Sequence, residues 1–173
     1  MSISQIVKTK HDGSITISDG TAVTPKTLTI DYEAGDFNLS IPGPSVSNFL
    51  DRGKFGTTPA LRYGDDAPIT FSFTANLRDL SDATYITLES IITNSGYFAS
   101  DWVATTGYTN STDPSEIVKT VKVLWTIEGS NHGDSADHTI TLNHCVLTGS
   151  LQEGDPNTVS ISGTAFVRFP VVS

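Results

Sequence analysis

The segment 68–77 constrains the fold of this chain more than any other stretch. Every second residue in it is apolar, and small polar residues fill the positions between. A period of two is the signature of a β-strand with one buried face. The buried face is predicted to carry Ile69, Phe71, Phe73, Ala75 and Leu77.

The period changes directly after this strand, and the change predicts a helix over 81–94. Ser81 is placed to act as its N-cap, and Leu80 and Tyr85 have the spacing of a hydrophobic staple. Asn94 and Gly96 follow the last apolar position and are typical of a helix end. The predicted apolar stripe of the helix consists of Tyr85, Leu88, Ile91 and Ile92.

Further strands are predicted from the same alternation, in the segments 15–17, 28–32, 37–41, 119–128, 138–148 and 158–169. The pair 28–32 and 37–41 is separated by a tight turn and predicts a hairpin. The last three strands predict a meander, with Gly163 at a bulge. Together these features predict a single mainly β domain over 1–173. Its expected architecture is an antiparallel β-sandwich or half-barrel flanked by one α-helix.

The segment 42–67 is unusual because no regular period is visible over so long a connection. It contains several apolar residues and three of the ten basic residues, Arg52, Lys54 and Arg62. Long connections in compact domains usually serve a function or are disordered. We weigh two interpretations equally: an arm that lies on another surface, or a loop folded back on its own sheet.

The predicted outer faces of the strands are rich in hydroxyl and amide groups, because only 17% of the residues are charged. One interpretation is the β-propensity of Thr on a solvated face. The other, which we favour, is that the strands meet copies of themselves in a closed oligomer. The positions concerned are Thr70, Ser72, Thr74 and Asn76; Thr139, Thr141 and Asn143; and Ser160, Ser162 and Thr164.

Composition sets limits on partners and compartment. The net charge of −9 argues against binding of nucleic acid, which requires cations. Cys145 is the single cysteine, so an internal disulfide is excluded. The first residues lack the pattern of a signal peptide, and no apolar run reaches the length of a membrane helix. We expect the cytoplasm, or a particle assembled in it.

No group of residues predicts catalysis, a metal or a cofactor. His138 and His144 would lie too far apart on one strand to share an ion, and the polar stretch 129–137 lacks the order of a calcium loop. The pair Asp65 and Asp66 precedes Ala-Pro and is typical of a turn. We therefore expect no enzyme. The rival from another class is a carbohydrate-binding β-sandwich that uses Tyr97, Trp102 and Tyr108.

The order of these elements resembles that of a major tail tube protein of a long-tailed, siphovirus-like bacteriophage. The resemblance rests on the early hairpin, the long insertion 42–67, the strand 68–77 that leads into the helix 81–94, and the terminal meander. It implies a subunit that joins others into rings, with six subunits expected per ring, and the rings stack into the tail tube through which DNA is delivered. A secretion-system tube ring is the nearest alternative.

The resemblance also implies roles for individual residues and for partners. It makes 42–67 an assembly loop to the neighbouring ring, and the strands Ile69–Leu77 and Val159–Val167 candidates for the channel lining. Implied partners are copies of the same chain, a tape-measure protein, a tail terminator and distal tail proteins, while DNA passes without specific binding. The implied location is the virion, assembled in the host cytoplasm, with no membrane. Inter-ring candidates are Phe49, Arg52, Lys54, Phe55, Arg62 and Tyr63; channel or inter-subunit candidates are Thr70, Ser72, Thr74, Asn76, Ser160, Ser162 and Thr164.

Overall fold

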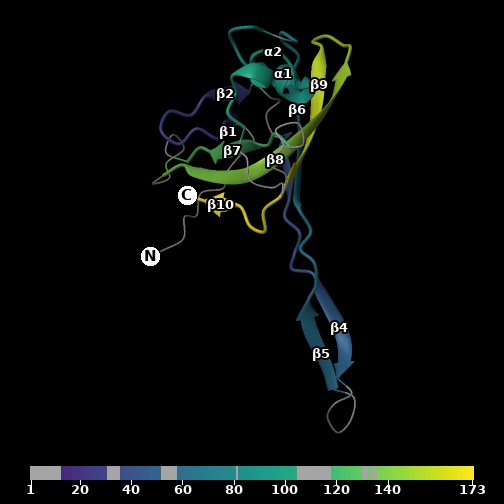
Figure 1. Ribbon diagram of the computed structural model, residues 1–173. Helices are drawn as coiled ribbons and strands as arrows, with labels where there is room; N and C mark the ends of the chain where they lie inside the picture. The colour runs from purple at the N-terminus through teal and green to yellow at the C-terminus, as the bar shows by residue number, and fades with distance from the viewer. Residues whose placement is uncertain are drawn as a thin grey trace.

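The computed structural model describes residues 13–30, 36–51, 58–80, 82–104, 118–129, 133 and 136–173. For residues 49–51 and 58–60 it describes the backbone alone. Antiparallel strands dominate these ranges and form a body from which one hairpin projects (Figure 1). The expected mainly β, antiparallel fold is therefore confirmed.

The body is built on one eight-stranded sheet with the path β2-β1-β7-β8-β9-β6-β3, and β10 pairs with β8 beside that path. The predicted meander of the last three long strands is confirmed as β7-β8-β9. The strands are β1 (Gly13–Ser18), β2 (Thr27–Ile30), β3 (Asn38–Ser40), β6 (Ile69–Asn76), β7 (Val121–Ile127), β8 (His138–Gln152), β9 (Thr158–Ala165) and β10 (Val171–Val172).

The sheet folds over on itself at β8, which is 15 residues long and belongs to both halves. Its first half pairs with β7 and its second half with β9. Phe37, just before β3, stacks near Trp125 of β7 with ring centroids 4.7 Å apart, although three strands separate β3 from β7 in the path. The two halves therefore face each other as layers, with the core between them.

The bend in β8 coincides with a change of phase at His144, whose φ is 54°. Leu142 and Cys145 both lie in the core, so the alternation slips by one residue between them. The buried face therefore passes from Leu142 to Cys145, and His144 and Val146 are only partly buried. A left-handed residue rotates the strand, which lets one strand supply buried side chains to both layers.

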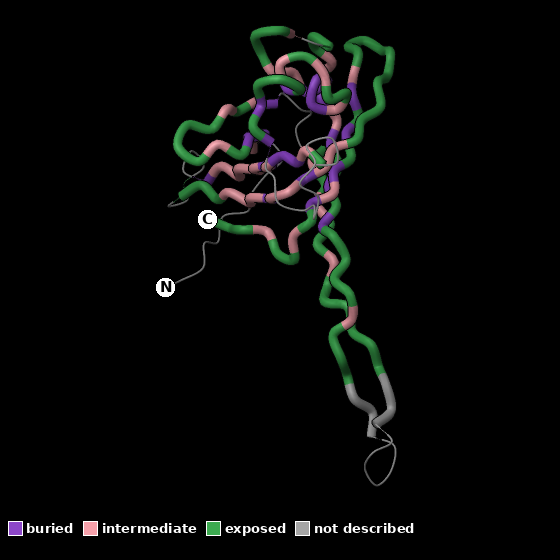
Figure 2. The backbone as a smooth tube through the Cα atoms, viewed as in Figure 1, coloured by how far each residue is buried: buried purple, intermediate pink, exposed green. Residues whose placement is uncertain are grey.

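The core is formed by apolar side chains from both layers. The buried residues are concentrated in these strands of the body (Figure 2). Gly163 lies in regular register opposite Phe71, and a Cβ at this position would overlap the Phe71 ring. The predicted bulge at Gly163 is thus wrong. The glycine instead provides room for an aromatic ring, and the irregularity of the meander lies between Val121 and Val123.

The predicted hairpin of 28–32 with 37–41 is also wrong. β2 pairs with β1, and β3 pairs with β6, so the two segments occupy opposite ends of the sheet path. Alternation in sequence identifies strands but does not identify their partners, because the same buried face fits several neighbours.

Two short helices take the place of the single helix predicted over 81–94: α1 (Leu88–Thr93) and α2 (Gly96–Ser100). α1 begins after Thr87, which forms a capping box with Ser90. Upstream, the Asp82 carboxylate accepts hydrogen bonds from the backbone N–H groups of Thr84 and Tyr85, which holds that segment in a turn.

The predicted caps of the single helix are therefore corrected. Leu80 and Tyr85 are exposed and form no staple, and Ser81 lies outside the described residues. The helix end is confirmed in part, because Asn94 caps α1 in the left-handed conformation.

The segment 42–67 is a β-hairpin rather than an irregular loop. β4 (Val46–Asp51) pairs with β5 (Thr58–Tyr63) in a two-stranded sheet of their own. We call 42–67 the arm. It points away from the body (Figure 1), so the alternative of a loop folded back on its own sheet is excluded for the described part of the segment.

Candidate assembly surfaces

The arm exposes large side chains that the body does not cover. Leu61 and Tyr63 of β5 are 74% and 75% exposed, and Val46 of β4 is 52% exposed. An isolated two-stranded hairpin is marginally stable in water, and exposed apolar side chains mark interaction sites. The arm thus has the properties of a surface that a partner covers.

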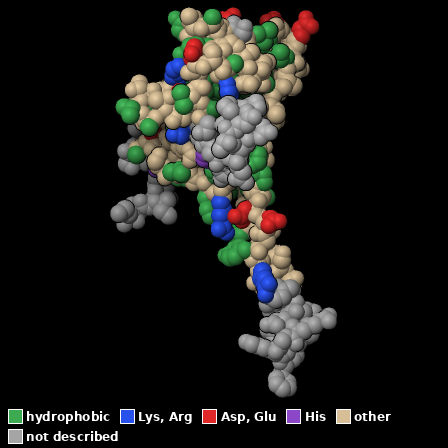
Figure 3. All heavy atoms as spheres, in the orientation of Figure 1, with side chains coloured by type: hydrophobic (Ala, Val, Ile, Leu, Met, Phe, Trp, Pro, Cys, Tyr) green, Lys and Arg blue, Asp and Glu red, His purple; other side chains and the backbone are tan. Residues whose placement is uncertain are grey.

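The base of the arm is fixed to the C-terminal segment through Arg168. Its Nε lies 3.3 Å from the Asp66 carboxylate, with both side chains about half exposed. The guanidinium also stacks over the rings of Tyr63 and Phe169, at 5.6 and 5.3 Å from their centroids. These contacts set the direction in which the arm leaves the body, and Figure 3 shows basic and acidic side chains adjacent there.

The predicted inter-ring residues fall on this arm, although the structure describes only some of them. Arg62 and Tyr63 are exposed on β5. Phe49 belongs to β4, where the backbone alone is described. Arg52, Lys54 and Phe55 lie outside the described residues. Their role in contacts between rings stays a prediction.

The predicted channel-lining residues share one surface of the layer that β3, β6, β9 and the second half of β8 form. β6 and β9 pair so that Thr70 faces Thr164, Ser72 faces Ser162 and Thr74 faces Ser160. β8 extends this ladder with Thr148 opposite Ser162 and Ser150 opposite Ser160. We call this surface the hydroxyl face; its predicted members are Thr70, Ser72, Thr74 and Asn76 of β6, and Ser160, Ser162 and Thr164 of β9.

The hydroxyl face contains no charged residue within β3, β6, β9 and the second half of β8, all of which are described. Phosphate groups bind mainly to cations, and such a surface offers none. Its hydroxyl and amide groups instead remain hydrated. The face can therefore lie against a polyanion without retaining it, although nothing in its geometry selects a ligand.

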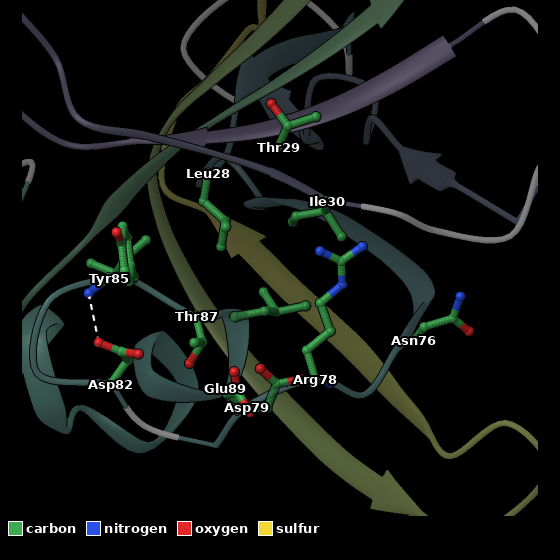
Figure 4. Close-up of a pocket in the computed structure, with 12 residues that line it drawn as sticks. Leu28, Thr29, Ile30, Asn76, Arg78, Asp79, Asp82, Tyr85, Thr87 and Glu89 are labelled. Carbon is green, nitrogen blue, oxygen red and sulfur yellow. Dashed lines mark hydrogen bonds between the residues drawn. The ribbon is translucent and has the colours of Figure 1, made fainter.

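A groove lies between β2 and α1, and we call it the acidic groove. It encloses about 240 Å³. Leu28 and Ile30 of β2 and Leu88 of α1 form its apolar part, while Arg78 lies near the carboxylates of Asp79 and Glu89 (Figure 4). Sequence analysis missed this groove because two segments distant in the chain, 28–30 and 76–89, form it.

Hydrogen bonds define the acidic side of this groove. The Thr84 hydroxyl, followed by the backbone N–H groups of Thr84 and Tyr85, stabilises the charged form of Asp82 and lowers its pKa. Glu89 is buried, and its carboxylate accepts a hydrogen bond from the backbone N–H of Arg78. Asp82 therefore stays ionised at neutral pH.

The described residues do not bring potential metal ligands together. They contain no group of three or more His, Cys, Asp or Glu side chains placed to hold an ion. Burial raises the pKa of the Cys145 thiol to about 12, which leaves it protonated and unreactive. In the described ranges, neither helix has the length and apolar character needed to cross a membrane.

The aromatic residues of the carbohydrate-binding alternative do not form a platform. Trp102 is buried in the core against Phe98, with ring centroids 6.0 Å apart. The Tyr97 ring is occupied by the Lys26 ammonium, 4.4 Å from its centroid. Tyr108 lies outside the described residues. A buried indole cannot stack on a sugar, so this use of Trp102 is wrong.

Comparison with known proteins gives a match of fold. No family model matches the chain, and no curated protein matches it in sequence. Its fold is similar to that of a chain in the cryo-EM structure of an extracellular contractile injection system, described as the PVC sheath/tube terminator in the extended state. The TM-score is 0.55 at 9% identity, over 99% of both chains.

A second similar chain comes from the baseplate of the anti-feeding prophage (AFP). Its TM-score is 0.49 at 10% identity, over 100% of this chain and 97% of the other. That score is too low to carry an argument. The first match shows the fold, and at such low identity it shows the fold alone.

Proposed function

We propose that this protein is a structural subunit of a phage tail tube. Copies join side by side into rings, six being the number implied by the resemblance, and the rings stack into a hollow tube. DNA passes through the channel without specific binding. In this role the protein is not an enzyme, and its partners are its own copies together with tape-measure, terminator and distal tail proteins. The particle is assembled in the host cytoplasm and becomes part of the virion.

The observation that carries this proposal is the full-length similarity of fold to a chain from a tube-containing particle. The match extends over 99% of each chain, so the arm and the body are compared together. That particle is described as a contractile injection system with a sheath/tube terminator. A domain that corresponds over its whole length to such a chain is a sound basis for proposing a related structural role.

Two surfaces of the molecule support the same role. The arm projects with exposed Leu61 and Tyr63, as a segment that reaches another subunit would. The hydroxyl face is uncharged, and the chain as a whole carries −9. A channel built from such faces repels phosphate groups or does not bind them. A basic lining would instead hold the genome by counterion release.

A second candidate function is a tube ring of a secretion or injection particle that delivers protein rather than a genome. The description of the first similar chain favours it. The two candidates share the ring and the tube but differ in cargo. Nuclease-protected DNA inside purified native particles supports the phage tail, and DNA-free particles support the second candidate.

The experiment is negative-stain electron microscopy of the purified protein across a range of concentrations. We expect hollow rings at low concentration and striated tubes at high concentration. A second experiment tests the channel lining with a variant that carries Thr70→Lys and Ser162→Lys on the hydroxyl face. If that face lines the channel, this variant forms tubes that retain added DNA, whereas wild-type tubes do not. A protein that stays monomeric at every concentration contradicts the proposed function.

A further inference from the structure

We propose that the acidic groove of one copy binds the tip of the arm of a second copy. This inference rests on the proposed function and deepens it, because it assigns the receptor for the arm. The groove and the arm lie at opposite ends of the molecule (Figure 1). The arm is two-stranded along its described length and points away from the body, so it does not reach the groove of its own chain.

Charge favours this pairing. Between Val46 and Tyr63 the arm carries Arg52, Lys54 and Arg62 against one carboxylate, Asp51, while Asp65 and Asp66 lie at its base. The groove carries three carboxylates against one cation; its charged residues are Asp79, Asp82, Glu89 and Arg78. The hairpin end of the arm and the groove therefore carry opposite net charge and attract each other between two copies. Such complementarity fixes both partner and orientation.

The size of the groove fits side chains of a protein partner better than a small ligand. Its volume of about 240 Å³ is below the roughly 300–1,000 Å³ of typical small-molecule sites. Leu28, Ile30 and Leu88 provide an apolar floor for an aromatic side chain, and in the sequence Phe55 directly follows the cations Arg52 and Lys54. Carboxylates around that floor suit the flanking Arg52 and Lys54.

The border of the groove adds backbone interactions. β2 contributes Leu28, Thr29 and Ile30, and it is the terminal strand of the sheet path in the described part of the chain. A terminal strand presents N–H and C=O groups along its outer edge, and an extended partner segment satisfies them by strand addition. The exposed ring of Tyr85 beside it supplies an apolar contact.

The symmetry of this contact matches a stack. An arm at one end that binds a groove at the other end is a heterologous contact, which repeats without closing when successive copies are translated along an axis. A closed pair of two copies would instead require each arm to reach back along its partner. The predicted contact therefore joins rings, while ring closure depends on other surfaces.

The first test uses charge reversal at Asp79, an exposed residue of the groove. Asp79→Lys should raise the critical concentration for stacking about tenfold, since repulsion replaces a pair and tenfold corresponds to about 1.4 kcal/mol. Glu153→Lys makes the same charge change in an exposed turn outside the groove and should leave stacking unchanged. Adding Arg52→Glu and Lys54→Glu to Asp79→Lys should restore stacking in part.

The second test maps the contact directly, in the full-length protein. A photo-reactive benzoylphenylalanine replaces Phe55, and cross-linked peptides are identified after irradiation of a concentrated solution. We expect cross-links to residues 76–89 of a second copy. Cross-links elsewhere, or none between copies, overturn the inference, as does unchanged stacking of Asp79→Lys.

The two proposals fail in distinguishable ways. Wild-type protein that forms neither rings nor tubes contradicts the proposed function, while intermolecular cross-links from position 55 to 76–89 would still support the contact. Tubes whose arm cross-links map to another surface contradict the contact and leave the proposed function in place.

Discussion

The body and the arm are both antiparallel β-structure, yet their strands are held in different ways. In the body, side chains such as Ile15, Ile161 and Phe73 are almost fully buried between two layers. In the arm, β4 and β5 pair with each other, and Leu61 and Tyr63 remain about three-quarters exposed. The burial of these side chains in the body stabilises the fold of a single chain. Those of the arm remain exposed, which fits the contact with a partner that we propose.

This difference leads us to expect that substitutions in the two regions affect folding and assembly differently. Changes in the body should lower the free energy of unfolding and reduce assembly only as a consequence. Changes in the arm should reduce assembly while the free energy of unfolding stays nearly constant. The following predictions are ordered by their expected effect on the free energy of unfolding.

The largest effect is expected from Phe73→Ala. Phe73 is 3% exposed and packs near Phe71 and Phe37, at centroid distances of 6.5 and 6.1 Å. Its truncation should lower the free energy of unfolding by about 3–5 kcal/mol, measured by urea denaturation. Ser72→Ala, on the exposed side of the same strand, should stay within about 0.5 kcal/mol. Equal effects would contradict the two-layer core.

An intermediate effect is expected from Cys145 at alkaline pH. Burial raises the pKa of its thiol from 9.0 to about 12 in the folded protein. The unfolded chain then loses this proton first, so its contribution to stability is complete below about pH 9 and is lost between about pH 9 and 12. Relative to Cys145→Ala, the free energy of unfolding of the wild type should fall by up to about 1.4 kcal/mol per pH unit in that window. Parallel curves for the two proteins would show that the thiol is not buried.

A smaller effect is expected from Arg168→Ala at the base of the arm. The ion pair with Asp66 is half exposed, so its loss should cost less than about 1 kcal/mol in thermal or chemical unfolding. Tube formation should nevertheless decrease, because the arm loses its fixed direction. Arg168→Lys keeps the charge but loses planar stacking on Tyr63, and should be intermediate. Normal tubes from Arg168→Ala would show that the direction of the arm is set elsewhere.

The smallest effect on unfolding is expected from Phe55→Asp in the arm. Circular dichroism and the free energy of unfolding should match the wild type, whereas stacking seen by electron microscopy should be abolished. Val23→Asp is the control, because Val23 is 90% exposed on the body and should tolerate the charge. Long tubes formed by Phe55→Asp would exclude this residue from the contact between rings.

Sequence reasoning found what is local and missed what depends on distant contacts. The alternation in 68–77 predicted β6 correctly because one buried face dictates it. The pairing of 28–32 with 37–41 failed because β2 pairs with the strand before it, β1, and β3 pairs with β6 on the far side of the arm. The helix start failed because a turn at Asp82 and a capping box at Thr87 outweighed the apolar stripe.

The same distinction applies to the candidate surfaces. The hydroxyl positions were visible as the polar half of an alternating pattern, so their common face was predictable. The aromatic and basic composition of 42–67 left an arm and a folded-back loop as equal alternatives, and its two strands were not predicted because no regular alternation is visible there. Arg168 and the acidic groove had no sequence signal, since their contacts join segments that only the fold brings together.

The bend of β8 at His144 has a mechanical consequence. Because one continuous strand serves both layers, a pull on either layer is carried along the covalent backbone and is not borne solely by contacts between the layers. The two layers are therefore joined covalently along β8 and resist sliding past each other.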